Sequence, residues 1–257
     1  MRLPYGMRPS RLDERSHYYT HFNLKKARDW VGRKIVYAVI VGRHSDIFPP
    51  QYKNEKDEPL IIDEYHNLHE VQQEIVRFLP EGVYYDRNYY KDFSLCHGRN
   101  LQNSWDWENF SGQELAFDLD PENVTCPIHG TLQERLAKGW GLGFCATAFT
   151  LIRTNTVQLY DLLKENYSDV RIVFSGRGFH IHVFDKDTRS LTRKERGILA
   201  LRYQNFGIDR WVTTGEMRLI RLPFSLNGIS SRVVVPLDVS QVDEFNPKQD
   251  ALPSFLK

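Results

Sequence analysis

Two aspartates, Asp118 and Asp120, follow the apolar residues 115–117 and precede Pro121. Side chains two residues apart on a strand point to the same side, so the pattern predicts two carboxylates on one face at the end of a buried strand. Mg²⁺ prefers oxygen ligands of this kind, and two-metal sites need carboxylates that reach ions about 3.5–4 Å apart. An Asp-x-Asp pair is also common at solvated strand ends, so it indicates a metal site only together with other residues.

A second polar group lies in the segment Ser-Gly-Arg-Gly-Phe-His-Ile-His at residues 175–182. Its glycines allow the backbone to approach an anion, and Arg177, between Ser175 and His180, can bind a phosphate with two hydrogen bonds. The alternative is a hairpin turn followed by a solvent-facing histidine pair, His180 and His182. A turn explains the glycines but not an arginine between a serine and a histidine. Both interpretations, phosphate binding and a hairpin turn, therefore remain open.

A third polar segment runs from Asp209 to Gly228. It offers one more carboxylate ahead of a strand-like run, and two guanidiniums, Arg218 and Arg221, along that run. Taken alone, Asp209 is better explained as a helix or turn cap, and the arginines as surface charges. Only the combination of the three segments points to a shared site.

The apolar periodicity predicts the elements that must position these side chains. Residues 179–184 alternate as in a strand with one polar face, and residues 145–166 have the spacing of an amphipathic helix. The other expected helices are 66–79 and 191–204, and the other expected strands are 34–42, 83–85, 114–120, 171–174, 217–222 and 232–237. This mixture predicts the α+β class, with a central sheet of hairpin character.

Composition narrows the range of functions. The 34 basic and 33 acidic side chains give a net charge of +1, so any nucleic-acid surface must be a local patch. Three irregularly spaced cysteines do not form a disulfide framework, and neither a signal segment nor a run of about 18 apolar residues is present. We therefore expect a soluble, intracellular protein, cytoplasmic in a prokaryote.

Read in order, ELAFDLD, VFSGRGFHIHV and DRWVTTGEMRLIRLPFSLNG resemble the three signature motifs of the archaeo-eukaryotic primase small subunit. The resemblance runs from about residue 83 to the C-terminus, and the first eighty residues match only loosely. It implies a single primase catalytic domain over residues 1–257, with central mixed or antiparallel sheets, flanking helices and an RRM-like catalytic core.

The resemblance also implies a function, namely the synthesis of short primers from NTPs or dNTPs by two-metal nucleotidyl transfer. Its expected partners are a single-stranded DNA template and a large primase subunit. By resemblance, Asp118, Asp120 and Asp209 are the catalytic acids and bind two Mg²⁺ or Mn²⁺ ions. The residues expected to bind the phosphates of the nucleotide, or to add positive charge near them, are Ser175, Arg177, His180, Arg218 and Arg221.

The sequence departs from the family pattern in two places. Asn227 stands where the family usually has a histidine, so the phosphate contact expected there is weakened or rebuilt, although an asparagine can still donate a hydrogen bond. The stretch between His182 and Asp209 is short, whereas many members carry a long helical insertion there. The chain is therefore expected to be a compact version of the family.

A zinc site is expected by the same resemblance, because members commonly carry a zinc knuckle after the first motif. Cys126, His129 and Cys145 occupy that place, in a possible small insertion at about residues 121–146. A structural Zn²⁺ takes four ligands, and the fourth is not evident, with Cys96 or His97 as distant candidates. The alternative is that both cysteines are ordinary thiols and that no metal binds.

Two other functions remain open. One is a repair (end-joining) or plasmid-type primase-polymerase of the same superfamily, because FDLDP also resembles the first motif of bacterial end-joining polymerases. The Arg-Leu-Ile-Arg-Leu-Pro phrase and the segment after it favour the replicative primase. The other is a single-stranded nucleic-acid-binding module that stacks bases on its aromatic side chains, which leaves the three acids unexplained.

Overall fold

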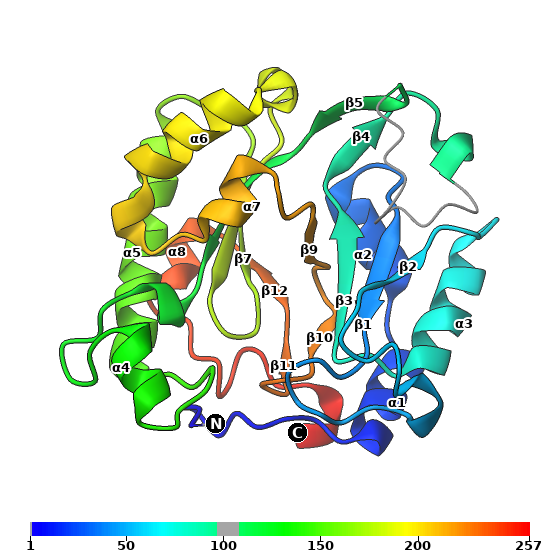
Figure 1. The fold of residues 1–257 in the computed structure, drawn as a ribbon, viewed down its shortest axis with the longest axis horizontal. Helices are drawn as coiled ribbons and strands as arrows, with labels where there is room; N and C mark the ends of the chain where they lie inside the picture. The colour runs from blue at the N-terminus through cyan, green and yellow to red at the C-terminus, as the bar shows by residue number, and fades with distance from the viewer. Residues whose placement is uncertain (1, 97–107) are drawn as a thin grey trace. The chain divides into compact units, whose positions relative to one another are not determined.

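The computed structural model describes residues 2–96 and 108–257, which form two compact units (Figure 1). Unit 1 consists of Met1–Met7, Gln113–Arg218 and Val235–Ala251, and unit 2 of Arg8–Gly112, Leu219–Val234 and Leu252–Lys257. Each unit combines helices with antiparallel sheets, which confirms the predicted α+β class.

Unit 1 is built on a four-stranded sheet with the order β12-β7-β8-β6, in which every neighbouring pair is antiparallel. Its strands are β6 (Leu115–Leu119), β7 (Val170–Phe174), β8 (Phe179–Val183) and β12 (Val235–Leu237). The register places Asp118 opposite His180 and Ala116 opposite His182. All five residues of β8 are buried, so the alternative of a solvent-facing histidine pair is wrong.

Helix α5 (Ala146–Lys164) covers the sheet of unit 1. Phe149 on α5 makes ring contacts with Phe174 and Phe179 at centroid distances of 6.1 and 5.6 Å. This contact confirms the amphipathic helix predicted for this segment, because its apolar stripe faces the core. The other helices of unit 1 are α4 (Leu132–Ala137), α6 (Arg193–Arg202), α7 (Arg210–Thr214) and α8 (Val239–Val242), with 3₁₀ turns η3 (Pro121–Asn123), η4 (Lys186–Ser190) and η5 (Gln204–Phe206).

Unit 2 has its own four-stranded antiparallel sheet, with the order β2-β1-β3-β9. These strands are β1 (Tyr37–Ile40), β2 (Leu60–Ile62), β3 (Gly82–Asp86) and β9 (Leu219–Arg221). Its helices are α1 (Leu12–Thr20), α2 (Leu24–Val31) and α3 (Leu68–Phe78), with 3₁₀ turns η1 (Pro50–Tyr52), η2 (Phe93–Cys96) and η6 (Ser254–Leu256). Two-stranded ribbons are formed by β10 (Leu226–Asn227) with β11 (Arg232–Val233) and by β4 (Asn88–Tyr90) with β5 (Phe110–Gln113).

The C-terminal part of the chain differs in detail from the expected strands. The run 232–237 is divided at Val234, so that β11 lies in unit 2 and β12 in unit 1. The amide of Val234 donates to the carbonyl of Ser225 rather than to a strand of either four-stranded sheet. No helix within the described residues is long and apolar enough to cross a membrane.

Candidate active site

Asp118, Asp120 and Asp209, here called the acidic cluster, come from two segments of unit 1 that an isolated backbone bridge brings together. Asp118 lies within β6, and Asp120 follows that strand directly. The amide of Asp209 donates to the carbonyl of Asp118 at 2.7 Å, next to a backbone bridge between Leu119 and Ile208. The segment before α7 therefore runs beside the end of β6, and its aspartate joins the other two.

The electrostatics of Asp209 show that the acidic cluster is crowded. Burial raises the pKa of its carboxyl group, and the carboxylate of Asp120 raises it further. The amide of Trp211 opposes this effect, because it donates to Asp209 Oδ1 at 2.8 Å. Asp209 is thus both the N-cap of α7, as its simplest interpretation predicted, and a neighbour of the other acids.

The turn between β7 and β8 lies directly against the acidic cluster. Within the turn, the amide of Ser175 donates to the Gly178 carbonyl at 2.9 Å, and the Gly178 amide donates to Ser175 Oγ at 3.2 Å. A Cβ atom at Gly178 would lie only 2.7 Å from Asp120 Oδ1 and would also collide with the Leu119 carbonyl. Only glycine fits there, and the Ser175 hydroxyl contributes to holding the turn.

Arg177, in the same turn, carries a positive charge close to Asp118 and Asp120. Burial alone lowers the pKa of its guanidinium, but the carboxylates of Glu122, Asp120 and Asp118 outweigh that effect, and the pKa is raised. Arg177 is 6% exposed, and its guanidinium forms an ion pair with Glu122 and donates to the Leu142 carbonyl at 2.9 Å. It therefore serves as an internal counter-ion.

Glu122 is a member of this site that the sequence analysis missed. Burial raises the pKa of its carboxyl group and Asp120 adds to the rise, while Arg177 lowers it. Glu122 lies two residues after Asp120, which could have pointed to it. However, Pro121 ends the strand, so the alternation of side chains along a strand no longer predicts where the Glu122 side chain points.

The two histidines of β8 contact carboxylates from neighbouring segments. His180 Nε2 lies 3.5 Å from Asp118 Oδ1, and the His180 side chain is 5% exposed. His182 Nδ1 lies 2.7 Å from Glu114 Oε1, and both of those side chains are completely buried. His180 thus contacts the acidic cluster. His182 and Glu114 instead form a completely buried pair with each other.

The remaining basic and polar candidates are divided between the two units. Arg218 is the last residue of the central segment of unit 1, and Arg221 and Asn227 belong to unit 2. In unit 2, Arg221 donates to the Tyr84 hydroxyl at 2.8 Å, and Asn227 Oδ1 accepts the Ile229 amide at 3.1 Å. Their predicted role at the phosphates stays a prediction.

A second cluster of unit 1 consists of Cys126, His129 and Cys145, here called the Cys/His cluster. Cys126 Sγ lies 3.6 Å from His129 Nδ1 and 3.5 Å from Cys145 Sγ. Burial raises the pKa of the Cys126 thiol, but the amides of Ile128 and His129 outweigh it, and the pKa is lowered. A lowered pKa favours the thiolate, which is the form that binds metals.

The geometry of the Cys/His cluster fits a zinc ion held by three side chains. All three ligand atoms lie within 4.8 Å of one another. Trp140 packs on the imidazole of His129 at a centroid distance of 4.6 Å, which fixes the ring. Of the candidates for a fourth ligand, Cys96 packs against Val36 in unit 2, and His97 lies outside the described residues.

The acidic cluster fits hard divalent cations by its donor set. Asp118, Asp120 and Asp209 offer oxygen atoms only, as Mg²⁺ and Mn²⁺ prefer. Like charges at a partly buried site are unfavourable unless cations compensate them, and the raised pKa of Asp209 reports that cost. Arg177 and His180 lie close to the same carboxylates.

Comparison with known structures defines the class of fold. The chain is similar to the polymerase domain of Mycobacterium tuberculosis ligase D, solved in complex with DNA, with a TM-score of 0.51 and 13% identity. The match covers 98% of this chain and 91% of that domain. At this identity the likeness concerns the fold alone.

Comparison of sequences then gives the family. The family model of the DNA primase small subunit matches residues 147–210. An "uncharacterized DNA primase small subunit-like protein" of Archaeoglobus fulgidus is 50% identical over 99% of this chain and 94% of its own length. The DNA primase small subunit PriS of Pyrobaculum calidifontis is 25% identical over 70% of this chain and 67% of its own length. The chain belongs to the archaeo-eukaryotic primase small-subunit family and is a primase-like nucleotidyltransferase.

Proposed function

We propose that this protein joins nucleotides on a single-stranded DNA template and starts the strand without a primer. The observation that carries the proposal is the hydrogen bond from the Asp209 amide to the Asp118 carbonyl, which joins two acids from distant segments. The family relatives are named as primase small subunits, and the structural neighbour is a polymerase domain in complex with DNA. NTPs or dNTPs are the expected substrates.

In this proposal each group of unit 1 has a distinct task. Asp118, Asp120 and Asp209 hold two divalent cations, Mg²⁺ or Mn²⁺. When bound, such ions activate the attacking 3′-hydroxyl and stabilise the leaving pyrophosphate. His180 orients the carboxylate of Asp118, with which it is in contact.

Arg177 would contribute positive charge on the phosphate side of the acidic cluster. It is already paired with Glu122, which holds the guanidinium in place beside Asp120. Positioning of this kind is effective in phosphoryl transfer, because the reaction depends mainly on placement and charge stabilisation. Ser175 supports the turn that carries Arg177 and, through its hydroxyl, is a further candidate for a phosphate contact.

We also propose that the Cys/His cluster binds one Zn²⁺ with a structural role. Cys126 and Cys145 supply thiolates, His129 supplies a ring nitrogen, and Trp140 holds that ring. The expected effect is on stability rather than on the chemical step, since a structural zinc site ties together the segments that carry its ligands.

The test is incubation with a single-stranded template, NTPs or dNTPs and Mg²⁺ or Mn²⁺, without a primer. New strands that require a template support the proposal. Extension of an annealed primer only would indicate a repair or plasmid-type polymerase instead. DNA binding with no incorporation under either condition would leave a single-stranded nucleic-acid-binding module.

A large primase subunit is the expected protein partner, because the relatives are named small subunits. The measurement is co-purification of the tagged chain from its native source, followed by identification of the bound protein. A stable partner that stimulates synthesis would support the replicative assignment, and full activity of the isolated chain on natural templates would contradict it.

A further inference from the structure

Trp211, in the first turn of α7, is exposed although it is a large aromatic residue. It is 65% exposed, and among the Trp, Tyr and Phe side chains of residues 2–96 and 108–257 it is the only exposed one. Tryptophan side chains are highly buried on average, because their large rings stabilise a fold when they pack. The ring of Trp211 contributes little packing to the protein and is available to a binding partner.

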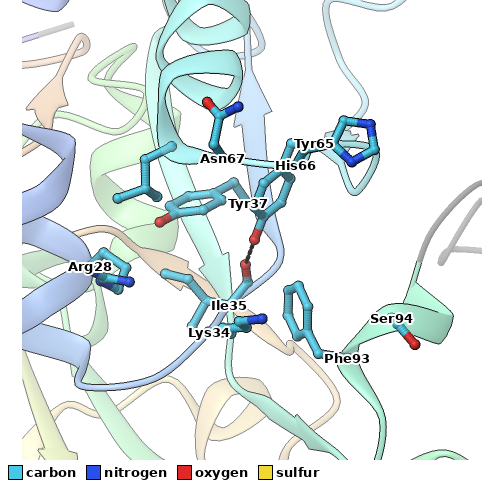
Figure 2. Close-up of a pocket in the computed structure, with 10 residues that line it drawn as sticks. Arg28, Lys34, Ile35, Tyr37, Tyr65, His66, Asn67, Phe93 and Ser94 are labelled. Carbon is cyan, nitrogen blue, oxygen red and sulfur yellow. Dashed lines mark hydrogen bonds between the residues drawn. The ribbon is translucent and has the colours of Figure 1, made fainter.

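The aromatic side chains of a pocket in unit 2 show the more usual arrangement (Figure 2). Tyr65 packs edge-on against Tyr37 and Phe93, with centroid distances of 5.8 and 6.3 Å. The Tyr65 hydroxyl also donates to the Ile35 carbonyl. These rings stabilise one another, whereas Trp211 makes no ring contact within the described part of the chain.

The backbone of Trp211 is held next to the acidic cluster. Its amide donates to Asp209 Oδ1 at 2.8 Å, and its carbonyl accepts the Met217 amide at 3.0 Å. Asp209 is also the N-cap of α7, the short helix that carries Trp211. The exposed ring is therefore attached to a backbone that is bonded to one of the acids, so a ligand that lies on this ring lies beside the acidic cluster.

The segment around Trp211 is basic, although the whole chain is nearly neutral. Residues 193–218, which include α6 and α7, contain six basic and three acidic side chains, and the two helices pack against each other (Figure 1). Lys194, Arg202 and Arg210 are exposed and form no ion pair with any described residue. Arg210 directly precedes Trp211. This is a local positive patch of the kind that a polyanion requires.

We propose that Trp211 stacks on a base of the single-stranded template, with Arg210 near the phosphate backbone of that strand. Aromatic rings beside basic side chains bind single strands of any sequence, because every base has a flat face and every nucleotide a negative charge. Trp211 is then a positioning residue, which holds the strand beside the acidic cluster and takes no part in the chemical step. The proposal rests on the proposed function, since it identifies the bound strand as the template.

The test is equilibrium binding of a labelled oligo(dT) strand to the full chain in EDTA. Trp211→Ala should weaken binding about tenfold, as expected for the loss of one stacked base. Trp211→Phe keeps a flat aromatic face and should bind within about threefold of the wild type, whereas Trp211→Leu should bind as weakly as the alanine variant. Leu162→Ala, which removes another exposed apolar side chain of unit 1, is the matched control and should bind as the wild type does.

Two further measurements separate positioning from a structural or chemical role. Because the ring is exposed, Trp211→Ala should leave the Tm unchanged. In synthesis without a primer it should raise the KM for the template about tenfold and change kcat much less, since a binding contact is lost rather than a contact made in the transition state. A lower kcat with an unchanged template KM would overturn the positioning role. A higher KM for the nucleotides alone would overturn the choice of the template.

Equal oligonucleotide affinities of Trp211→Ala and Leu162→Ala would overturn the proposal and leave the exposed ring to a protein partner. Failure of the proposed function is a separate outcome, because binding in EDTA requires neither divalent cations nor synthesis. A wild-type chain that binds the strand through Trp211 but forms no product would contradict the proposed function and support stacking. Synthesis without a primer, combined with wild-type strand binding by Trp211→Ala, would support the proposed function and contradict stacking.

Discussion

The acidic cluster and the Cys/His cluster belong to the same unit, but their surroundings shift the pKa values of their acidic groups in opposite directions. At the acidic cluster, burial and Asp120 raise the pKa of Asp209, so neighbouring groups oppose its ionisation. At the Cys/His cluster, the amides of Ile128 and His129 overcome burial and lower the pKa of Cys126. The first site is left with charge to be compensated, and the second stabilises its own charge.

This difference is informative about the roles of the two clusters. The three ligand atoms of the Cys/His cluster are already within 4.8 Å of one another, which suits a permanently bound soft ion. The acidic cluster has oxygen donors and an adjacent Arg177, which suits hard ions that arrive with phosphates. We therefore expect loss of one cluster to affect turnover, and loss of the other to affect stability.

The largest effect is expected from Asp118→Ala. Nucleotide incorporation should fall by about 1,000-fold, since metal ions contribute several kcal/mol to such reactions and each 1.36 kcal/mol is tenfold. The measurement is incorporation on a single-stranded template, with circular dichroism to establish folding. Asp161→Ala, which changes an exposed aspartate on α5, is the control and should retain full activity. Equal rates for both variants would contradict the assignment of the acidic cluster.

The second-largest effect is expected from Arg177→Ala, and it concerns the stability of the fold. This substitution leaves the partly buried Glu122 without its counter-ion and should lower the free energy of unfolding by about 3 kcal/mol. Adding Glu122→Gln should recover part of that loss, because the uncompensated carboxylate is removed. Urea denaturation of the single and double variants measures both numbers. If Arg177→Ala unfolds at the wild-type urea concentration, the ion pair does not stabilise the acidic cluster.

Removal of zinc should have a somewhat smaller effect, on stability alone. Elemental analysis should find one zinc per chain, and a hundredfold excess of zinc over its Kd contributes about 2.7 kcal/mol. Cys126→Ser and Cys145→Ser should lose the ion and lower the Tm. Cys96→Ser, which changes the thiol of unit 2, should retain the zinc. Zinc retention in all three variants would show that the cluster is not the site.

The smallest effect is the pH dependence of Asp209→Asn. Folding raises the pKa of the Asp209 carboxyl group above the pKa of an unfolded aspartate, near 3.8. As the pH rises above 3.8, ionisation of this group therefore destabilises the folded protein, and the loss of stability persists at neutral pH. Without divalent cations, Asp209→Asn should therefore slightly raise the Tm at pH 7, and this gain should vanish at acid pH. Asparagine still caps α7, so the helix is retained. A lower Tm for the variant at pH 7 would contradict the claim that ionised Asp209 destabilises the protein in the absence of divalent cations.

The sheet and the main helix of unit 1 could be predicted from the sequence, because their apolar residues follow the period of each element. This holds for β6, β8 and α5. Helix α1 gave no such signal, since its buried residues are Glu14, Arg15 and Tyr19. Arg15 donates to backbone carbonyls inside unit 2, and no periodicity rule predicts a buried arginine.

The candidate site could be predicted in part. Asp118 and Asp120 follow from strand geometry, but the placement of Asp209 beside them depends on a backbone pairing between segments about 90 residues apart, which only the family resemblance suggested. The burial of His182 was not predictable, because its partner Glu114 stands 68 positions away. Glu122 was missed because Pro121 breaks the alternation that pointed to the other acids.

Metal binding by the acidic cluster tests the central claim most directly. Mn²⁺ binding should be followed by electron paramagnetic resonance and calorimetry for the wild type, Asp118→Asn, Asp209→Asn and the control Asp161→Asn. We predict that both cluster variants lose the Mn²⁺ sites together, while the control retains them. Wild-type Mn²⁺ binding in Asp209→Asn, with an unchanged rate of incorporation, would contradict a shared site.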